Sequence, residues 1–135
     1  MAEKPSLLIV DDEAGVLFTL HLVFQDAGYV VTTADSEAQA IQVLRKPGEF
    51  DAILTDMSME NDQSGLAVAR AAAQLRPRPV IIIFTGFGTA ENETGALENA
   101  ADHFAMKPID IDDFKNVLAR LLSLRSDRLA ARGGR

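Results

Sequence analysis

The chain has 135 residues, a formal net charge of −7, 47% hydrophobic residues and no cysteine. This length suits a single domain, since domains usually span roughly 100–200 residues. The acidic balance argues against a surface that wraps nucleic acid or anionic lipid. The lack of cysteine excludes disulfides, thiolate metal sites and cysteine nucleophiles. No apolar run reaches the roughly 20 residues of a membrane helix. We therefore expect one soluble, cytoplasmic domain that contacts no membrane.

Five short apolar runs predict the strands of a sheet. They lie at residues 7–10, 29–33, 52–55, 80–84 and 103–106, and the fifth is the weakest. They are rich in β-branched side chains and do not alternate between apolar and polar residues, as a strand with one solvent-exposed face would. Such runs are typical of strands buried on both faces. The intervals between them leave room for one helix and two short loops each.

Helical patterns occupy these intervals. The first runs over about residues 13–27. Ser36 can cap the second, with Gln39 reaching back in a capping box, and this helix ends at residues 47–48. The third is built from small residues and stops before Pro77. The order of elements predicts a helix between each pair of neighbouring strands.

The sequence predicts the last helix more clearly than the one before it. The pattern at residues 90–99 is weak because a glycine lies inside it, whereas Asp110 is a good N-cap for a final helix of regular apolar spacing. The whole order is (βα)5, an α/β fold with a doubly wound parallel sheet, flavodoxin-like, in strand order 2-1-3-4-5. We assign residues 1–124 to this domain. Residues 125–135 are polar and basic, and we interpret them as an extension of the last helix or the start of a linker.

Reactive side chains gather where the predicted strands end, which is where open parallel sheets bind ligands. They are, in chain order, Asp11, Asp12, Glu13, Asp56, Thr85 and Lys107. Carboxylates from neighbouring strands repel one another and raise each other's pKa unless a cation lies among them. Such oxygen ligands suit Mg²⁺, and a lysine and a hydroxyl suit phosphate oxygens. The pattern therefore predicts phosphoryl transfer, with metal and lysine neutralising the phosphoryl charge.

Four motifs at these strand ends resemble the receiver domain of bacterial two-component response regulators. They are Val-Asp-Asp-Glu at 10–13, Leu-Thr-Asp-Met at 54–57, Phe-Thr-Gly at 84–86 and Met-Lys-Pro at 106–108. The resemblance covers about residues 5–124, and the stretches 85–88 and 101–108 are most similar to receivers of the nitrogen-regulation class. It implies a signalling switch in a phosphorelay, which accepts a phosphoryl group from a sensor histidine kinase or a phosphotransfer protein and controls an output domain or partner. It implies no enzyme beyond its own phosphorylation and dephosphorylation.

The resemblance also implies a role for each residue of the acidic cluster. Asp56 is the phosphoacceptor and a ligand of Mg²⁺, for which Mn²⁺ can substitute. Asp12 binds the metal directly, Asp11 mostly through water, and the backbone carbonyl of Ser58 completes the protein ligands.

Further roles follow for the other strand ends. Thr85 and Lys107 hold the phosphoryl oxygens, and Phe104 matches the aromatic residue that rotates inward on activation. The bond between Lys107 and Pro108 is cis in the family, although an isolated X-Pro bond is cis only about 5% of the time.

We expect two residues at the mouth of the site to modulate the phosphorylated state, since each follows a reactive residue by two positions. Ser58 leaves access for water, whereas Phe87 screens the phosphoryl group and slows its loss. We expect the face of the fourth helix, fifth strand and fifth helix to change on phosphorylation and to form or break a homodimer. No direct contact with nucleic acid is expected of this domain.

The chain departs from the family pattern at one loop. Receivers usually carry proline four residues after the phosphoacceptor and glycine at the eighth position. Here Glu60 stands at the fourth position, and Gly65 comes at the ninth. The loop at residues 57–64 is therefore one residue longer.

Three other functions are disfavoured. A hydrolase of the haloacid-dehalogenase type needs a second aspartate two residues after its nucleophile, but Glu13 follows Asp11 and Ser58 follows Asp56 at that distance. A flavin-binding domain needs a hydroxyl- and glycine-rich phosphate loop after its first strand, where this chain has three acids. A degenerate receiver that acts only as a docking module is expected to lack an acid, the lysine or the hydroxyl, all of which are present.

Overall fold

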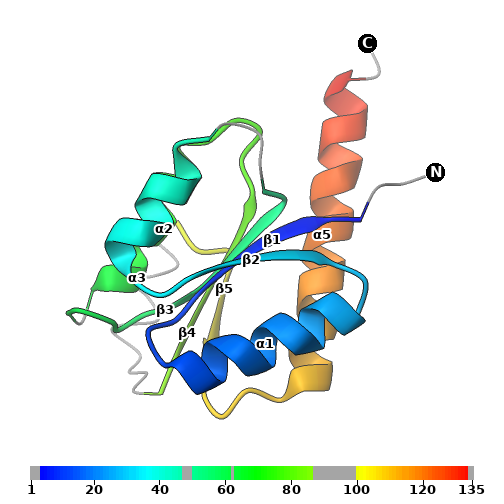
Figure 1. Ribbon diagram of the computed structural model, residues 1–135. Coiled ribbons are helices and arrows are strands. Elements are labelled where there is room, and N and C mark those ends of the chain that lie inside the picture. Colours follow the sequence, from blue (N-terminus) through cyan, green and yellow to red (C-terminus); the bar gives the residue numbers. More distant parts are fainter. Residues whose placement is uncertain (1–3, 47–49, 62, 87–99, 134–135) are drawn as a thin grey trace.

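The computed structural model describes residues 4–46, 50–61, 63–86 and 100–133 (Figure 1). Its elements, in chain order, are β1 (Ser6–Val10), α1 (Ala14–Asp26), β2 (Val30–Ala34), α2 (Glu37–Leu44), β3 (Ala52–Asp56), α3 (Ser64–Ala73), β4 (Val80–Thr85), β5 (His103–Met106) and α5 (Ile111–Gly133). All strand pairs are parallel, and the strand order is β2-β1-β3-β4-β5. The predicted sheet and its strand order are confirmed.

Helices cover both faces of the sheet. Figure 1 shows α1 and α5 on one side, and α2 and α3 on the other. Alternate residues of each central strand point to opposite faces. Ile9 and Leu54 therefore join the core under α1 and α5, whereas Leu8 and Ile53 join the core under α2 and α3. The apolar runs without alternation reflect this two-sided burial.

The expectation of burial on both faces is wrong for the outer strands. β1, β3 and β4 are buried along nearly their whole length, but β2 begins at an exposed Val30 and is only half-buried up to Ala34. β5 ends at Met106, which is also exposed. An edge strand has a neighbour on one side only, so helices on two faces cover it less completely than a central strand.

The predicted helix starts are largely confirmed. The Ser36 hydroxyl accepts the Gln39 backbone N–H at 3.1 Å, and the Asp110 carboxylate accepts the Asp113 N–H at 3.1 Å. The Gln39 side chain reaches back as predicted, but it accepts the N–H of Asp35 at 2.7 Å, one residue before the cap. The bonds from Gln39 and Asp113 each satisfy an N–H that the first helical turn leaves without an intrahelical partner.

Helix α5 continues without a break to Gly133, well past residue 124. Arg125 is buried in this extension, with its guanidinium 2.8 Å from the Asp51 carboxylate and its Nε donating to the Arg78 carbonyl at 2.8 Å. Asp51 also accepts the Ser6 N–H at 2.8 Å. The extension is therefore attached to the start of the sheet, and the division at residue 124 stays a prediction.

The predicted fourth helix at 90–99 lies outside the described residues. The predicted end of the second helix at 47–48 is wrong, because α2 ends at Leu44, where Arg45 is its C-cap and begins a turn. Within the residues that the structure describes, no helix is long and apolar enough to cross a membrane.

Candidate functional site

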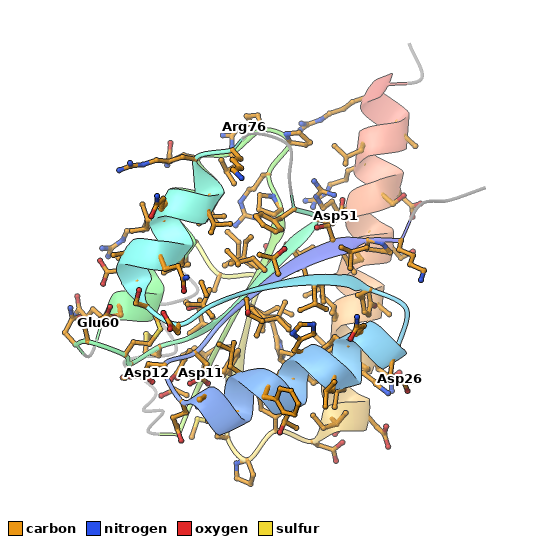
Figure 2. All side chains as sticks on the ribbon, in the orientation of Figure 1. Asp11, Asp12, Asp26, Asp51, Glu60 and Arg76 are labelled. Carbon is orange, nitrogen blue, oxygen red and sulfur yellow. The ribbon has the colours of Figure 1, made fainter. Side chains whose placement is uncertain are left out.

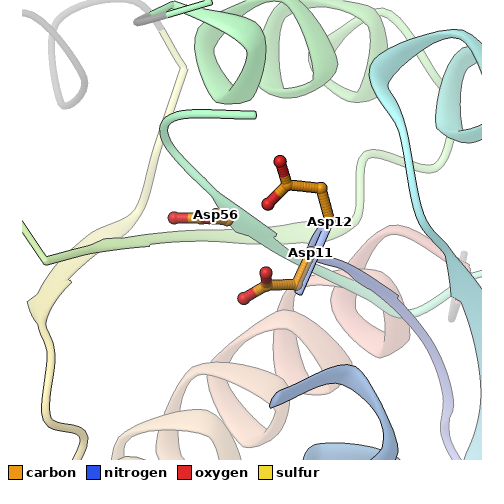
Figure 3. A group of neighbouring side chains, drawn as sticks. All are labelled: Asp11, Asp12 and Asp56. Atoms are coloured by element: carbon orange, nitrogen blue, oxygen red, sulfur yellow. The ribbon is translucent and has the colours of Figure 1, made fainter. Parts of the chain in front are cut away.

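Three carboxylates meet at the carboxyl edge of the sheet (Figure 3). Asp56 is the last residue of β3, and Asp11 and Asp12 follow β1 directly. Each offers an oxygen atom, and these atoms all lie within 4.8 Å of one another. Pairing of Val10 with Thr55 aligns the ends of β1 and β3, which places the next residues side by side. The predicted convergence of the acids is confirmed.

Lys107 lies among the acids, just after β5. Its Nζ is 3.1 Å from an Asp11 oxygen and 3.6 Å from oxygens of both Asp56 and Glu13. Its backbone N–H donates to the Thr85 carbonyl at 2.8 Å, which joins the ends of β5 and β4. The ammonium also lies 5.4 Å from the centre of the Phe84 ring, within the range of a cation–π contact. The Lys107–Pro108 bond is cis, as the resemblance implied.

Burial and like charge make ionisation of Asp56 costly. The residue is only 5% exposed, and burial together with the charges of Asp11 and Asp12 raises its pKa to about 6, although the Lys107 ammonium opposes the rise. Burial also raises the pKa of Asp11. Burial alone would lower the pKa of Lys107, but its hydrogen bond and proximity to Asp11 outweigh this and raise it. The site holds more negative charge than its lysine balances.

Asp11 has both carboxylate oxygens engaged. One accepts the backbone N–H of Glu13 at 2.8 Å, and the other accepts Lys107 Nζ. Asp11 is fully buried, whereas Asp12 is exposed. Glu13 joins the cluster through Lys107, although sequence reasoning assigned it no role. Its position directly after Asp12 at a strand end was the available signal.

The other predicted residues divide between site and core. Thr85 ends β4 and is buried beside the acids, opposite Met106 of β5. Phe104 is 8% exposed and packs in the core under α2 and α3, so its side chain points inward. Its predicted movement stays a prediction. Ser58 is half-buried in the loop after β3. Phe87 lies outside the described residues.

The longer loop after β3 is held by its own hydrogen bonds. Asn61 accepts the Gln63 N–H at 2.8 Å, and its own N–H donates to the Ser64 hydroxyl at 3.1 Å. Both Glu60 carboxylate oxygens lie 3.2 Å from the backbone nitrogen of Glu37, the first residue of α2. Glu60 thus places a negative charge at a helix N-terminus, where the helix dipole favours it, and connects the loop to α2.

Gly65 permits a close approach between α3 and the backbone of Asp56. A Cβ atom at this position would lie 2.3 Å from the Asp56 carbonyl oxygen and 2.6 Å from Met57 Cα. The Gly65 N–H donates to the Met57 carbonyl at 2.7 Å. Any side chain here would push the end of β3 away from α3. Sequence reasoning noted Gly65 only as a displaced family position.

The donor set suits a magnesium ion. Three carboxylates supply only hard oxygen ligands, and one of them is exposed enough to leave room for water. Mg²⁺ prefers such oxygen atoms and keeps several waters. The excess of negative charge around Lys107 provides the electrostatic attraction.

Residues 7–119 match the protein-family model described as response regulator receiver domain. This chain belongs to that family. The receiver matches transcriptional regulatory proteins over part of their length. GlrR of Escherichia coli is 32% identical over 113 residues, which cover 83% of this chain and 25% of GlrR. AlgB of Pseudomonas putida is 32% identical over 130 residues, which cover 95% of this chain and 29% of AlgB.

The receiver spans between a quarter and a third of the length of these relatives. Its fold matches solved receivers. The CheY-like receiver of Methanospirillum hungatei has a TM-score of 0.85 at 24% identity, covering 94% of this chain and 99% of that one. NtrX of Brucella abortus has a TM-score of 0.85 at 21% identity, covering 98% of this chain and 30% of that one. These relatives agree with the expected likeness to the nitrogen-regulation class.

Proposed function

We propose that this receiver accepts a phosphoryl group on Asp56 in the presence of Mg²⁺ and thereby controls an output domain or partner. Membership of the receiver family establishes the coarser function, phosphorylation-controlled signalling. The assignment of Asp56 is carried by one observation. Its buried carboxylate lies between two further acids and the Lys107 ammonium, at the edge of the sheet where ligands bind.

The environment of each acid favours Asp56 as the nucleophile. Asp11 uses one oxygen for Lys107 and the other for a backbone N–H, so it is held in place as a supporting residue. The distance from Lys107 Nζ to Asp56, 3.6 Å, is longer than a hydrogen bond. The ammonium is thus near the carboxylate without being hydrogen-bonded to it, and can turn to a phosphoryl oxygen.

The transfer exchanges one bond to phosphorus for another. An Asp56 oxygen attacks the phosphorus of a phosphohistidine, an O–P bond forms, and the N–P bond breaks. The imidazole nitrogen keeps the electron pair and is protonated. Lys107 and Thr85 bind oxygens of the transferred group as its charge redistributes. Asp11, Asp12, Asp56 and the Ser58 carbonyl would hold Mg²⁺, which when bound neutralises phosphoryl charge.

The surface beside the site fits the approach of the donor, a sensor histidine kinase or a phosphotransfer protein. A hollow of about 570 Å³ lies between α1 and the start of α5, and Glu13 and Lys107 form its border with the acids. Val16 and Ile111 are among its apolar lining residues. A donor helix that covers these side chains brings its histidine to Asp56.

The output step rests on the family resemblance and on the position of Phe104. We propose that phosphorylation changes the face formed by the fourth helix, β5 and α5 and forms or breaks a homodimer. Ser58 and Phe87 tune the lifetime of the phosphorylated state, and the domain itself does not bind nucleic acid. Beryllium fluoride should change amide exchange on β5 and α5, and an unchanged pattern would contradict this switch.

Mass spectrometry after incubation with acetyl phosphate and Mg²⁺ tests the phosphoacceptor. We expect the wild-type chain to gain the mass of one phosphoryl group, and neither the Asp56→Asn variant nor a magnesium-free sample to do so. Asp26→Asn is the control, because Asp26 is exposed at the end of α1, away from the site. An adduct that persists in Asp56→Asn would overturn the assignment.

A further inference from the structure

Five arginines line one pocket at the opposite end of the sheet from the acids. They come from the turn before β4 and from the second half of α5, and they are Arg76, Arg78, Arg125, Arg128 and Arg132. The other described residues that line it are a proline and a leucine, so no carboxylate is among them. Figure 2 labels Arg76 beyond the amino ends of the strands, whereas Asp11 and Asp12 lie beyond their carboxyl ends. We call this hollow the arginine pocket.

The concentration of positive charge is unusual for this chain. The whole sequence contains nine arginines and has a net charge of −7, yet more than half of these arginines line one pocket. Arg125, Arg128 and Arg132 follow the spacing i, i+3, i+7, which places them on one face of α5. Like charges on one helix face repel one another, so an anion bound among them would relieve this repulsion.

Neighbouring carboxylates compensate only part of this charge. Arg78 pairs with Asp102 at 3.1 Å, and Arg125 pairs with Asp51 at 2.8 Å. Arg76 donates to backbone carbonyls, which are neutral. Within the parts of the chain that the structure describes, Arg128 and Arg132 make no hydrogen bond or ion pair. Three positive charges in the pocket therefore have no acidic partner among the described residues.

The pocket also has a fixed floor. Arg125 is 6% exposed, and its Nε donates to the Arg78 carbonyl, so the helix and the turn are held together. Arg78 donates in addition to the Ala100 carbonyl. The exposed side chains of Arg128 and Arg132 thus lie beside a base that is already ordered. The arginines of this base need no further ordering on binding, which lowers the entropic cost for the pocket as a whole.

We propose that the arginine pocket binds a small anion with two adjacent phosphate groups, such as a free diphosphate or the diphosphate of a nucleotide. Its volume is about 230 Å³, below the roughly 300–1,000 Å³ of sites for drug-sized ligands. Guanidinium forks match phosphate oxygens in pairs. Among the described residues that line the pocket none is aromatic and able to stack on a base, so recognition rests on the phosphates.

Calorimetric titration of the full chain with inorganic pyrophosphate tests the proposal. EDTA and constant ionic strength exclude anion binding through a metal at the acidic site. We expect saturable one-site binding, similar binding of ADP, and at least about tenfold weaker binding of orthophosphate, which lacks the second group of charged acceptors. The double variant Arg128→Ala, Arg132→Ala should bind pyrophosphate at least about tenfold more weakly. Both residues are exposed, so the fold should persist, which circular dichroism checks.

The matched control is Arg45→Ala with Arg120→Ala, which removes the same charge from exposed positions outside the pocket. We expect its affinity for pyrophosphate to change less than about twofold. The absence of saturable binding, or equal weakening in both double variants, would overturn the proposal. A short DNA duplex that binds more tightly than pyrophosphate would also overturn it, and would assign the pocket to a nucleic-acid backbone.

Discussion

Removal of the Asp56 charge should stabilise the metal-free receiver at neutral and alkaline pH. The folded protein raises the pKa of this carboxyl from its ordinary value of 3.8 to about 6. A carboxyl with a raised pKa favours the folded state when protonated, and this contribution is fully present below pH 3.8 and is lost as the pH rises through 6. Asp56→Asn keeps the shape of the side chain and avoids the loss.

The magnitude follows from the size of the shift. One pKa unit corresponds to about 1.36 kcal/mol. The rise from 3.8 to about 6 therefore makes the ionised Asp56 cost about 3 kcal/mol of the free energy of unfolding at pH 8. At pH 4.5 the folded carboxyl is largely protonated and the cost falls to about 1 kcal/mol. The advantage of the asparagine variant should shrink by about 2 kcal/mol between these two pH values.

Urea denaturation in EDTA at both pH values measures the two free energies. Wild type and variant share the remaining carboxyls, so their difference reports the Asp56 charge together with its repulsion by Asp11 and Asp12. Asp26→Asn at the exposed end of α1 is the control and should leave the free energy nearly unchanged. Added Mg²⁺ should stabilise the wild type more than Asp56→Asn, since the variant lacks one carboxylate ligand. Equal stability of wild type and Asp56→Asn at pH 8 without metal would refute the picture of a strained acidic cluster.

Three further predictions follow from the contacts around the site and the last helix. Gly65→Ala should lower both stability and phosphorylation from acetyl phosphate, because its Cβ would lie 2.3 Å from a carbonyl oxygen. Gly15→Ala is the control, because a Cβ there meets open space and should lower neither. Equal stability and equal phosphorylation of the two variants, measured by unfolding and mass spectrometry, would contradict this. Asp12→Ala should weaken Mg²⁺ binding in calorimetry more than Asp11→Ala, and the reverse order of Mg²⁺ affinities would exclude Asp12 as the direct ligand. Asp11→Ala should cost more stability than Asp12→Ala, since Asp11 is buried and holds Lys107. Arg125→Ala should lower the free energy of unfolding by about 2 kcal/mol, the scale of a hydrogen bond to a charged group, and an unchanged denaturation midpoint would show that the extension of α5 does not support the sheet.

The sequence alone determined the topology and most of the site. Buried parallel strands produce short apolar runs without alternation, and helices produce a different period, so the order of elements could be predicted before any contact was known. Since the carboxyl ends of parallel strands share one edge, residues far apart in the chain could also be placed together. Asp11, Asp56 and Lys107 meet for this reason.

The tertiary structure decided the features that depend on how loops and helix ends lie against the sheet. No local pattern distinguishes an edge strand from a central one, so the exposure of Val30 appeared only once the neighbours of β2 were known. The contact of Glu60 with the start of α2 and the approach of Gly65 to Asp56 both depend on the path of one loop.

At the end of the chain, too, the composition is read from the sequence and the contacts only from the tertiary structure. Residues 125–135 are polar and basic by composition, which predicts either a helical extension or a linker. Helix α5 continues to Gly133, and the Arg125 guanidinium reaches Asp51, just before β3 and 74 residues earlier in the chain. Such a long-range ion pair leaves no periodic signal, since it depends on where two distant segments lie in space. The sequence therefore supplied the charges of the arginine pocket, and only the packing of α5 against the sheet brought them together.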